Sequence, residues 1–169
     1  DADLYWPYVS DPEICRYMSW DAHADKEQTR AFLQRLEVDC REGRSRNWSV
    51  FLKGSGCFCG CIGLISIRRK HRALTYDSAE LAYWLGAEFR GKGIMTEAAN
   101  AVIDYAFREG RFHRLTVAHL QINQGSEGVV KRLGFQRIGE CRDEFQKNGT
   151  WQTTVHYDLL CSDPRPHVQ

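Results

Sequence analysis

Residues 90–96 read Arg90-Gly91-Lys92-Gly93-Ile94-Met95-Thr96, and this stretch joins a strand-like run to a helix-like run. A glycine-rich turn that opens a helix leaves several backbone N–H groups free and directed at one point. The positive end of the helix dipole and two cationic side chains add attraction for an anion there. We therefore predict a cradle for a pyrophosphate group, held mainly by the main chain of residues 90–96.

The residues on either side of this stretch predict a strand–helix–strand unit. Residues 79–86 are almost entirely apolar except for Glu80, which is typical of a central strand. Residues 94–108 have helical apolar periodicity, and Leu115 and Val117 mark the next strand. Such a unit crosses over in the right-handed sense and leaves its two strands parallel and adjacent.

Further elements on both sides extend this unit into a larger sheet. Asp25 and Gln28 form a capping box that opens a helix, and Gly43 ends it. The remaining predicted elements are strands at 48–52 and 57–67 joined by a Gly-Ser-Gly turn, a short helix at 126–133, and strands near 135–141 and 151–160. The pattern predicts an α+β fold with a mixed, largely antiparallel twisted sheet, a central parallel pair of strands and flanking helices.

The composition is that of an ordinary globular chain. The 169 residues fit one domain spanning 1–169, with 43% hydrophobic and 27% charged residues. The net charge of +1 argues against nucleic-acid binding as the main activity, because nucleic-acid-binding domains usually carry a clear basic excess. No apolar run approaches membrane-spanning length and no basic-then-apolar leader opens the chain, so we expect a cytoplasmic protein without a membrane partner.

Seven cysteines are present, including Cys57, Cys59 and Cys61. Alternate spacing on a strand places these three on one face with roughly parallel side chains, a poor geometry for disulfides. The sequence has no C-x-x-C pair, and no ligand spacing links the histidines His113, His119 and His156. We therefore predict buried, reduced thiols, structural or surface histidines, and no metal site.

A basic run, residues 68–72 with the sequence RRKHR, follows the second predicted strand. A solvated loop is the expected structure, and contact with an acidic partner or a nucleotide phosphate is the alternative. In the alternative, His71 and its neighbouring arginines lie at the mouth of a cleft.

Several stretches taken together resemble the GNAT N-acetyltransferases. The strand at 79–86 followed by Arg90-Gly91-Lys92-Gly93-Ile94-Met95-Thr96-Glu97-Ala98 is similar to the family's acetyl-CoA motif, and Asn123-Gln124-Gly125-Ser126 followed by Leu133-Gly134-Phe135 is similar to its second cofactor motif. Ser10-Asp11-Pro12-Glu13 and Asn148-Gly149-Thr150-Trp151 resemble the branch that acetylates serine or alanine N-termini of ribosomal proteins. The resemblance covers residues 1–160 and implies the GNAT fold, in which the two central parallel strands splay apart. The family usually opens with a strand that is not visible in this sequence.

The resemblance implies acetyl-CoA as the cofactor. The pantetheine arm would lie between the splayed strands and pair with backbone groups near Trp84 and Leu85, while residues 91–96 hold the pyrophosphate. Asn123 would hydrogen-bond the arm, although from its position alone it is a turn residue after a strand. Met95 departs from the Gly or Ala of most relatives, and it would narrow the turn if its side chain pointed inward.

The acceptor amine must be neutral to attack a thioester, so a base or a water chain has to take its proton. Glu80, a carboxylate in a largely apolar strand, is one candidate, and pairing with a cation across the sheet is the alternative. Glu144 is the other candidate, because it matches a loop glutamate near the acceptor amine in the ribosomal branch. A solvated loop carboxylate is the alternative for Glu144.

The leaving thiolate needs a proton donor, and many GNAT enzymes supply a tyrosine one turn before the Gly-Phe pair. In this chain that position is Val130, so the usual acid is missing. Ser126 is the best-placed substitute, as in the ribosomal branch. It is also a candidate N-cap of its helix.

The resemblance implies a primary-amine acceptor and direct attack in a ternary complex. A protein N-terminus is the first choice, and a small molecule such as an antibiotic, a toxin or a polyamine is the alternative. A non-catalytic acyl-CoA-binding module is the third interpretation. Trp20 and Trp151 are candidate residues of the acceptor pocket, with core packing as their alternative. The sequence leaves a monomer and a homodimer equally open.

Overall fold

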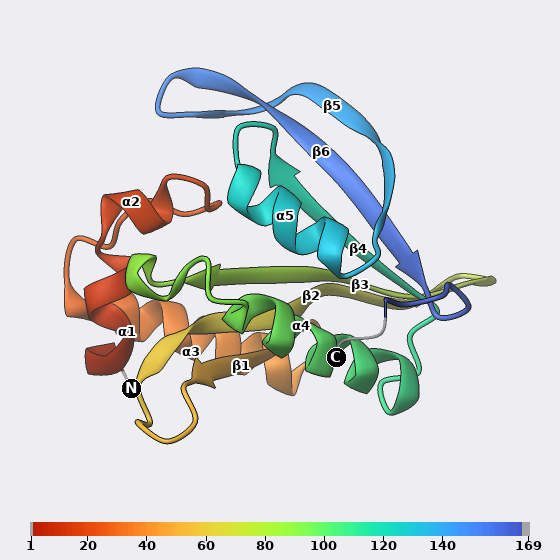
Figure 1. Cartoon of the computed structure of the whole chain (residues 1–169), viewed down its shortest axis with the longest axis horizontal. Helices are drawn as coiled ribbons and strands as arrows, with labels where there is room; N and C mark the ends of the chain where they lie inside the picture. Colours follow the sequence, from red (N-terminus) through yellow and green to blue (C-terminus); the bar gives the residue numbers. More distant parts are fainter. Residues whose placement is uncertain (1, 167–169) are drawn as a thin grey trace.

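The computed structural model describes residues 2–166 and contains a six-stranded sheet with helices on both faces (Figure 1). The helices are α1 (Ala2–Val9), α2 (Pro12–Cys15), α3 (Lys26–Arg41), α4 (Ile94–Arg108) and α5 (Gln124–Arg132), with one turn of 3-10 helix at Ala87–Phe89. The strands are β1 (Arg46–Phe51), β2 (Phe58–His71), β3 (Leu74–Leu85), β4 (Arg114–Leu120), β5 (Gln136–Lys147) and β6 (Thr150–Leu160). Their order in the sheet is β1-β2-β3-β4-β6-β5. The predicted mixed α+β fold is therefore confirmed.

The pair β3–β4 is parallel, and the other neighbouring strands are antiparallel. Only three residue pairs join β3 to β4: Ser78 pairs with Arg114, Ala79 with Leu115 and Glu80 with Thr116. Beyond the third pair the two strands diverge while each keeps its antiparallel neighbour on the other side (Figure 1). The predicted splayed central pair is thus present, and it opens the sheet at its middle.

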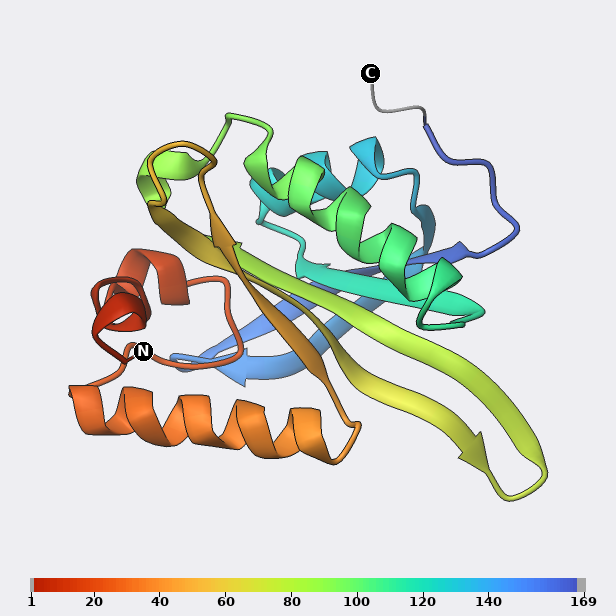
Figure 2. The ribbon, with the colours of Figure 1, turned by 90° about the horizontal axis from the view of Figure 1, so that it is seen from below.

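Helices lie on both sides of the sheet (Figure 2), and two apolar clusters hold them there. The larger cluster lies between the sheet and α4, and four of its fully buried leucines come from four different strands: Leu64, Leu81, Leu115 and Leu159. The smaller cluster packs α1 and α2 on the opposite side of the sheet, where Tyr5 contacts Phe58 and Trp84. Successive side chains of β3 thus supply both clusters, as expected for a strand buried on both faces.

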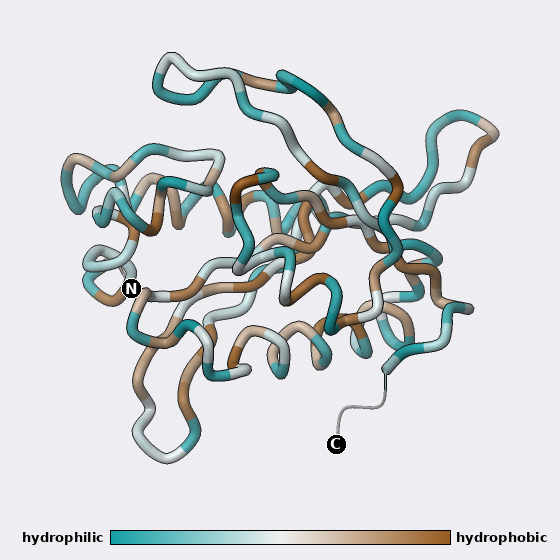
Figure 3. The backbone as a smooth tube through the Cα atoms, turned by 45° about the horizontal axis from the view of Figure 1, so that its top comes forward, coloured by the Kyte–Doolittle hydropathy of each residue, from teal (hydrophilic) through white to brown (hydrophobic). Residues whose placement is uncertain are grey.

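The hydropathy of the chain follows this arrangement (Figure 3). Hydrophobic segments concentrate in the middle of the sheet and on α4, whereas the hairpin of β5 and β6 is mostly hydrophilic toward its tip. Within residues 2–166, none of the helices has the length and hydropathy needed to cross a bilayer.

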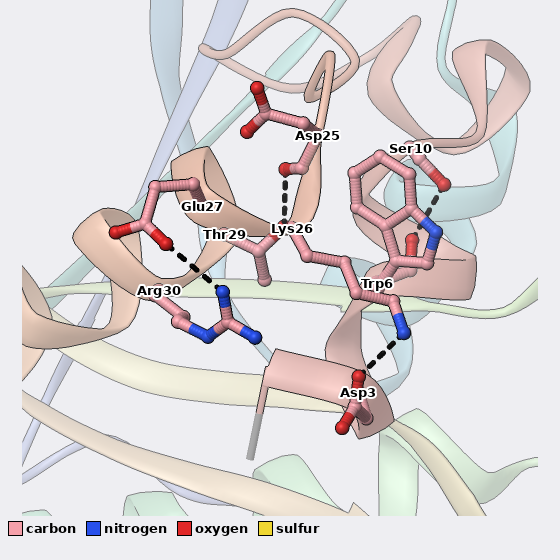
Figure 4. Close-up of polar contacts among 8 residues, drawn as sticks. All are labelled: Asp3, Trp6, Ser10, Asp25, Lys26, Glu27, Thr29 and Arg30. Carbon is pink, nitrogen blue, oxygen red and sulfur yellow. Dashed lines mark hydrogen bonds and ion pairs between the residues drawn. The ribbon is translucent and has the colours of Figure 1, made fainter.

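Local side-chain contacts fix the start of α3 against α1 (Figure 4). Asp25 accepts a hydrogen bond from the Gln28 N–H at 2.8 Å, so the predicted cap is present. Gln28 Oε1 in turn accepts from the Ala24 N–H at 2.8 Å, one residue before the predicted partner. Lys26 Nζ lies 2.6 Å from Asp3 Oδ1 and links α3 to α1.

The basic run at 68–72 was expected to be a loop, and this prediction is wrong for most of it. Residues 68–71 continue β2 into a long hairpin with β3 that projects from the body (Figure 2). The Arg68 guanidinium lies 3.7 Å from the centre of the Tyr76 ring, and that of Arg69 lies 3.9 Å from the centre of the Phe112 ring. Cation–π contacts of this kind let consecutive arginines sit in a strand rather than in a solvated loop.

The cysteine prediction is wrong in two respects. Cys57 precedes β2, and Cys59 and Cys61 belong to different core clusters, so the three do not share a face. The cause is the shift of the β1–β2 register between Val50 and Phe51, which changes the alternation of β2 at that point. In addition, only three cysteines are buried, and the exposed ones are Cys40, Cys57, Cys141 and Cys161.

Gly60 allows β2 to approach β3 where β3 has already left β4. A Cβ atom at Gly60 would lie 2.2 Å from the Trp84 carbonyl oxygen, so either strand would have to shift. We expect Gly60→Ala to lower the free energy of unfolding by about 1–3 kcal/mol, measured by chemical denaturation.

Gly139→Ala is the matched control, because a Cβ atom there meets nothing within 4 Å. The control should change the free energy of unfolding by less than about 0.5 kcal/mol. Equal stability of the two variants would contradict the close approach of β2 and β3 at Gly60.

Candidate functional site

The gap between β3 and β4 begins directly after Glu80 and Thr116. Trp84 and Leu85 pair with Cys61 and Gly60 of β2, so their other edge faces the gap without a partner strand. A free strand edge of this kind can bind an extended ligand through backbone hydrogen bonds. The two residues predicted to hold the pantetheine arm therefore lie at the opening.

The N-terminus of α4 lies at the end of β3 and forms the predicted cradle. Gly93 is its N-cap in a left-handed conformation, φ 77°, and no side chain caps the helix. Among the described residues, no acceptor binds the backbone N–H groups of residues 91–96. A Cβ atom at Gly91 or Gly93 would meet nothing within 4 Å, so open space lies beside these donors. Uncapped donors, open space and a helix dipole together fit a pyrophosphate group.

The side chains of the cradle divide into exposed cations and buried anchors. Arg90 and Lys92 are exposed, whereas Met95 is 4% exposed and packs in the larger core cluster. The Met95 side chain therefore points away from the cradle and does not narrow the turn. Arg132 of α5 donates from Nε to Thr96 Oγ1 at 3.4 Å, which places a third cation beside α4.

Asn123 is the N-cap of α5, and the suggestion that Ser126 fills this role is wrong. The Asn123 Oδ1 atom accepts from the Ser126 N–H at 3.1 Å, because α5 begins at Gln124 rather than at Ser126. Asparagine favours this position, since its short amide reaches the free N–H groups of the first turn. The Ser126 hydroxyl is thereby left free for another contact.

That contact is Tyr83, which sequence reasoning missed. The hydroxyls of Tyr83 on β3 and Ser126 on α5 lie 2.8 Å apart and span the gap between the two elements. Burial raises the pKa of Tyr83 to about 12, so the phenol is protonated at neutral pH. The sequence does contain a sign of this contact: Tyr83 lies in an apolar strand, and a buried tyrosine hydroxyl usually needs a hydrogen-bond partner. Val130, at the position of the family's usual tyrosine, is fully buried and apolar.

A second polar group lies on the other face of the sheet, where β5 and β6 meet. His156 Nε2 lies 2.8 Å from Thr154 Oγ1 and 3.3 Å from Glu144 Oε2, and Thr154 also donates to Glu144. His156 was expected to be structural or at the surface, and it is a half-buried member of this network. The sequence indicates this contact only through spacing: His156 lies two residues after Thr154, so both side chains point to the same face of the strand.

Glu80 shares this face with the network of Glu144 and His156. Glu80 and His156 line a cavity of about 390 Å³ between β3, β4, β5 and β6. Burial, with a smaller contribution from the Glu144 carboxylate, raises the pKa of Glu80, and His156 acts in the opposite direction. No cation pairs with Glu80 among the salt bridges of the described residues, so its carboxylate remains available.

The tip of the β5–β6 hairpin is tied to the loop that follows α2. Lys147 Nζ donates to the carbonyl oxygens of Met18 at 2.6 Å and Trp20 at 2.9 Å. Trp20 packs on Phe32 of α3, with ring centres 5.9 Å apart, and Trp151 is 58% exposed. Neither tryptophan lines the cavity that contains Glu80, so the structure does not bring these predicted pocket residues together with the carboxylates.

Comparisons with known proteins agree with this geometry. Residues 1–136 match a family model described as an acetyltransferase (GNAT) domain. The chain is 37% identical over 105 residues to the putative ribosomal N-acetyltransferase YdaF of Bacillus subtilis, covering 62% of this chain and 55% of that protein. It is 32% identical over 92 residues to the [ribosomal protein uS5]-alanine N-acetyltransferase of Escherichia coli, covering 54% of this chain and 47% of that protein. The matched segment thus spans about half the length of these two curated relatives.

A likeness to solved structures extends over nearly the whole chain. Spermidine N-acetyltransferase from Vibrio cholerae, solved with CoA and spermine, superposes with a TM-score of 0.82 at 20% identity. The superposition covers 96% of this chain and 90% of that chain. At this identity the likeness shows the fold.

The raised pKa of Glu80 makes a testable contribution to stability. A carboxyl whose folded-state pKa lies above its ordinary value of 4.5 binds protons more tightly in the folded state. Stability therefore falls as the pH rises from about 4.5 through the raised pKa. We expect Glu80→Gln to be more stable than the wild type at neutral pH and to lose less stability over this window, as measured by denaturation at a series of pH values.

Glu37→Gln is the control, because Glu37 is an exposed carboxylate on α3. It should leave the pH dependence of the wild type unchanged. If the free energy of unfolding depended on pH in the same way in the wild type and in Glu80→Gln, burial would not raise the pKa of Glu80, and the prediction would be wrong.

Proposed function

The chain belongs to the GNAT family of N-acetyltransferases, and on that premise we propose that it transfers the acetyl group of acetyl-CoA to the α-amino group of a protein N-terminus. The observation that carries the transfer itself is the position of two sets of polar groups on opposite faces of the sheet. A hydroxyl pair, Tyr83 and Ser126, links β3 to α5 on one face. The carboxylates of Glu80 and Glu144 lie on the other face of the sheet.

The cofactor is acetyl-CoA, as in the rest of the family. The backbone N–H groups of residues 91–96 would hold its pyrophosphate, with Arg90 and Lys92 adding positive charge. The free edge of Trp84 and Leu85 would hold the pantetheine arm, with the amide nitrogen of Asn123 as a further donor. When bound, acetyl-CoA supplies a thioester whose carbonyl carbon accepts the amine.

On the acceptor face, Glu80 and Glu144 attract the ammonium form of the acceptor and take a proton from it. Glu144 is better placed for releasing that proton, because its side chain is exposed while its Oε2 atom contacts the buried Thr154 and the half-buried His156. Glu80 is half-buried, and burial raises its pKa, which makes it a stronger base than an ordinary carboxylate. We assign the first proton acceptance to Glu80 and the proton release to the network of Glu144.

On the cofactor face, the Ser126 Oγ–H would donate a hydrogen bond to the departing sulfur and stabilise the thiolate, which takes its proton from solvent. This requires the Tyr83 hydroxyl to donate to Ser126 Oγ, so that the Ser126 hydrogen stays free to point at the sulfur. We propose that Tyr83 is a positioning residue and that Ser126 replaces the tyrosine missing at Val130.

A protein N-terminus is supported as the acceptor by the charges of the cavity. Two of its acidic neighbours are already paired, Glu140 with Arg137 and Asp158 with Arg114. The remaining carboxylates, Glu80 and Glu144, suffice for one ammonium group, whereas a polyamine carries several. The relatives named for ribosomal-protein acetylation point the same way. Such an acceptor implies a cytoplasmic enzyme.

The acceptor class is tested by measuring thiol release from acetyl-CoA with a panel of amines. The panel contains peptides beginning with Ser or Ala, an aminoglycoside, spermidine and the same peptides with blocked N-termini. We expect turnover with the free peptides alone, because the cavity offers charge for one ammonium group. Turnover with spermidine and not with the peptides would favour the small-molecule alternative, and binding of acetyl-CoA without any turnover would favour the non-catalytic module.

The hydroxyl pair is tested by a double-mutant cycle in the same assay. We expect Ser126→Ala to lower kcat by about 10²-fold, because it removes the hydrogen-bond donor to the leaving thiolate, and Tyr83→Phe to lower it by about tenfold. The double variant should resemble Ser126→Ala, because the two hydroxyls act as one unit.

Tyr105→Phe is the matched control, since Tyr105 is a half-buried tyrosine of α4 whose ring packs on Trp48, away from the gap. Its kcat should equal that of the wild type. Fully multiplicative effects of Ser126→Ala and Tyr83→Phe would contradict the coupling of the two hydroxyls.

A further inference from the structure

Three side chains with different ligand atoms meet beside the acceptor cavity. The Sγ atom of Cys141, a carboxylate oxygen of Glu144 and a ring nitrogen of His156 all lie within 4.8 Å of one another. Cys141 and His156 also line the cavity of about 390 Å³ that contains Glu80. We refer to these three residues as the thiol–imidazole cluster.

The register of β5 and β6 places two members of the cluster on one face. Cys141 pairs with Thr154, and His156 follows Thr154 by two residues, so both side chains point to the same side of the sheet. The contact between His156 Nε2 and Thr154 Oγ1, at 2.8 Å, agrees with this placement.

The third member reaches the same face because β5 is irregular there. Between the pairs Cys141–Thr154 and Phe145–Gln152, residues 142–144 of β5 face the single residue Thr153 of β6. Asp143 in this bulge has a φ of 50°, in the left-handed region. The bulge turns Glu144 back over Thr154 and His156, where a regular strand would not place it together with Cys141.

We propose that the thiol–imidazole cluster binds one zinc ion, with Cys141 Sγ, His156 Nε2 and a Glu144 oxygen as its protein ligands. Zinc accepts this mixture of sulfur, nitrogen and oxygen, whereas Mg²⁺ and Ca²⁺ prefer oxygen ligands. Three protein ligands leave the fourth position of a tetrahedral ion open toward the cavity. Cys141 binds as the thiolate, so its proton is released to solvent when the metal binds.

The distances and exposure allow the cluster to close on an ion. Zinc–ligand bonds of about 2.0–2.3 Å place tetrahedral ligand atoms roughly 3.3–3.8 Å apart. The Glu144–His156 distance of 3.3 Å already satisfies this requirement. Cys141 and Glu144 are exposed, so their side chains can rotate by the remaining distance of about 1 Å without disturbing the core.

The charge around the cluster favours a cation. Glu80 faces the same cavity, and Arg114, which also lines it, is held by Asp158 at 3.0 Å, while Arg137 of β5 is held by Glu140. Neither of these two guanidinium groups neutralises Glu80 or Glu144, whose negative charge would attract a divalent ion.

A zinc ion in the cluster would act as an inhibitor, and this consequence rests on the proposed function. The ion would occupy the oxygen of Glu144 and the nitrogen of His156 that receive the acceptor's proton. It would also place positive charge where the ammonium group of the acceptor binds. Zinc should therefore compete with the acceptor amine and not with acetyl-CoA.

The binding test uses the full chain, freed of metal with a chelator and kept reduced by a phosphine. Titration with Zn²⁺ in a calorimeter should give one site per chain, and Co²⁺ should produce a thiolate-to-cobalt absorption band. Cys141→Ser should abolish that band and weaken Zn²⁺ binding by roughly tenfold or more, since loss of even an outer-shell partner has effects of that size. His156→Ala should weaken Zn²⁺ binding to a similar extent.

Cys161→Ser is the matched control, because Cys161 is exposed and its Sγ atom lies 3.6 Å from His113 Nδ1, a pair that no third ligand joins within residues 2–166. It should keep both the band and the affinity, and circular dichroism shows that each variant is folded. Absence of a one-to-one site, or an unchanged site in Cys141→Ser, would overturn the proposal.

The inhibition test compares each variant with its own rate in the absence of metal. Zinc should raise the KM for the acceptor in the wild type, and the concentration for half-inhibition should be roughly tenfold or more higher in Cys141→Ser. Because the calorimetric and cobalt experiments need no turnover, a wrong acceptor leaves their outcome unaffected. Inhibition that is equal in wild type and Cys141→Ser would assign the effect to another site.

Discussion

The parallel contact between β3 and β4 is the constraint on which the site depends. It lasts for three residue pairs, and then each strand follows its own antiparallel neighbour. The gap that results leaves the edge of Trp84 and Leu85 without a strand partner. A closed sheet would satisfy these backbone groups internally, so the divergence converts ordinary β-structure into a binding surface.

The end of β3 leads directly from this gap into a second set of unsatisfied donors. Helix α4 begins at Gly93 without a capping side chain, whereas α3 and α5 are capped by Asp25 and Asn123. The missing cap of α4 indicates a binding site, because an uncapped helix N-terminus is less stable unless a ligand supplies the missing acceptor. In the proposed function, the free strand edge would hold the pantetheine arm of the cofactor and the free helix end its pyrophosphate.

The acidic and basic chemistry of the proposed reaction is separated by the sheet. The alternation of β3 directs Tyr83 toward α5 and Glu80 toward β5 and β6, because residues an odd number apart point to opposite faces. Burial, together with the neighbouring Glu144 carboxylate, makes the ionised form of Glu80 less favourable and so raises its pKa. The same crowding of acids makes this face attractive to a cation, whether an ammonium group or a metal ion.

The sequence by itself determined the elements whose signals are local. The turn at residues 90–96, the helix at 94–108 and the cap at Asp25 follow from glycine, periodicity and side-chain type, and the structure contains each of them. The basic run at 68–72, the partition of the cysteines and the partnership of Tyr83 with Ser126 were decided by the tertiary structure. They depend on strand register, on a bulge and on contacts between residues far apart in the chain, and a one-residue change of register exchanges the two faces of a strand. Local sequence therefore specified where the chain could bind a phosphate, and only the packed sheet specified which polar side chains meet around it.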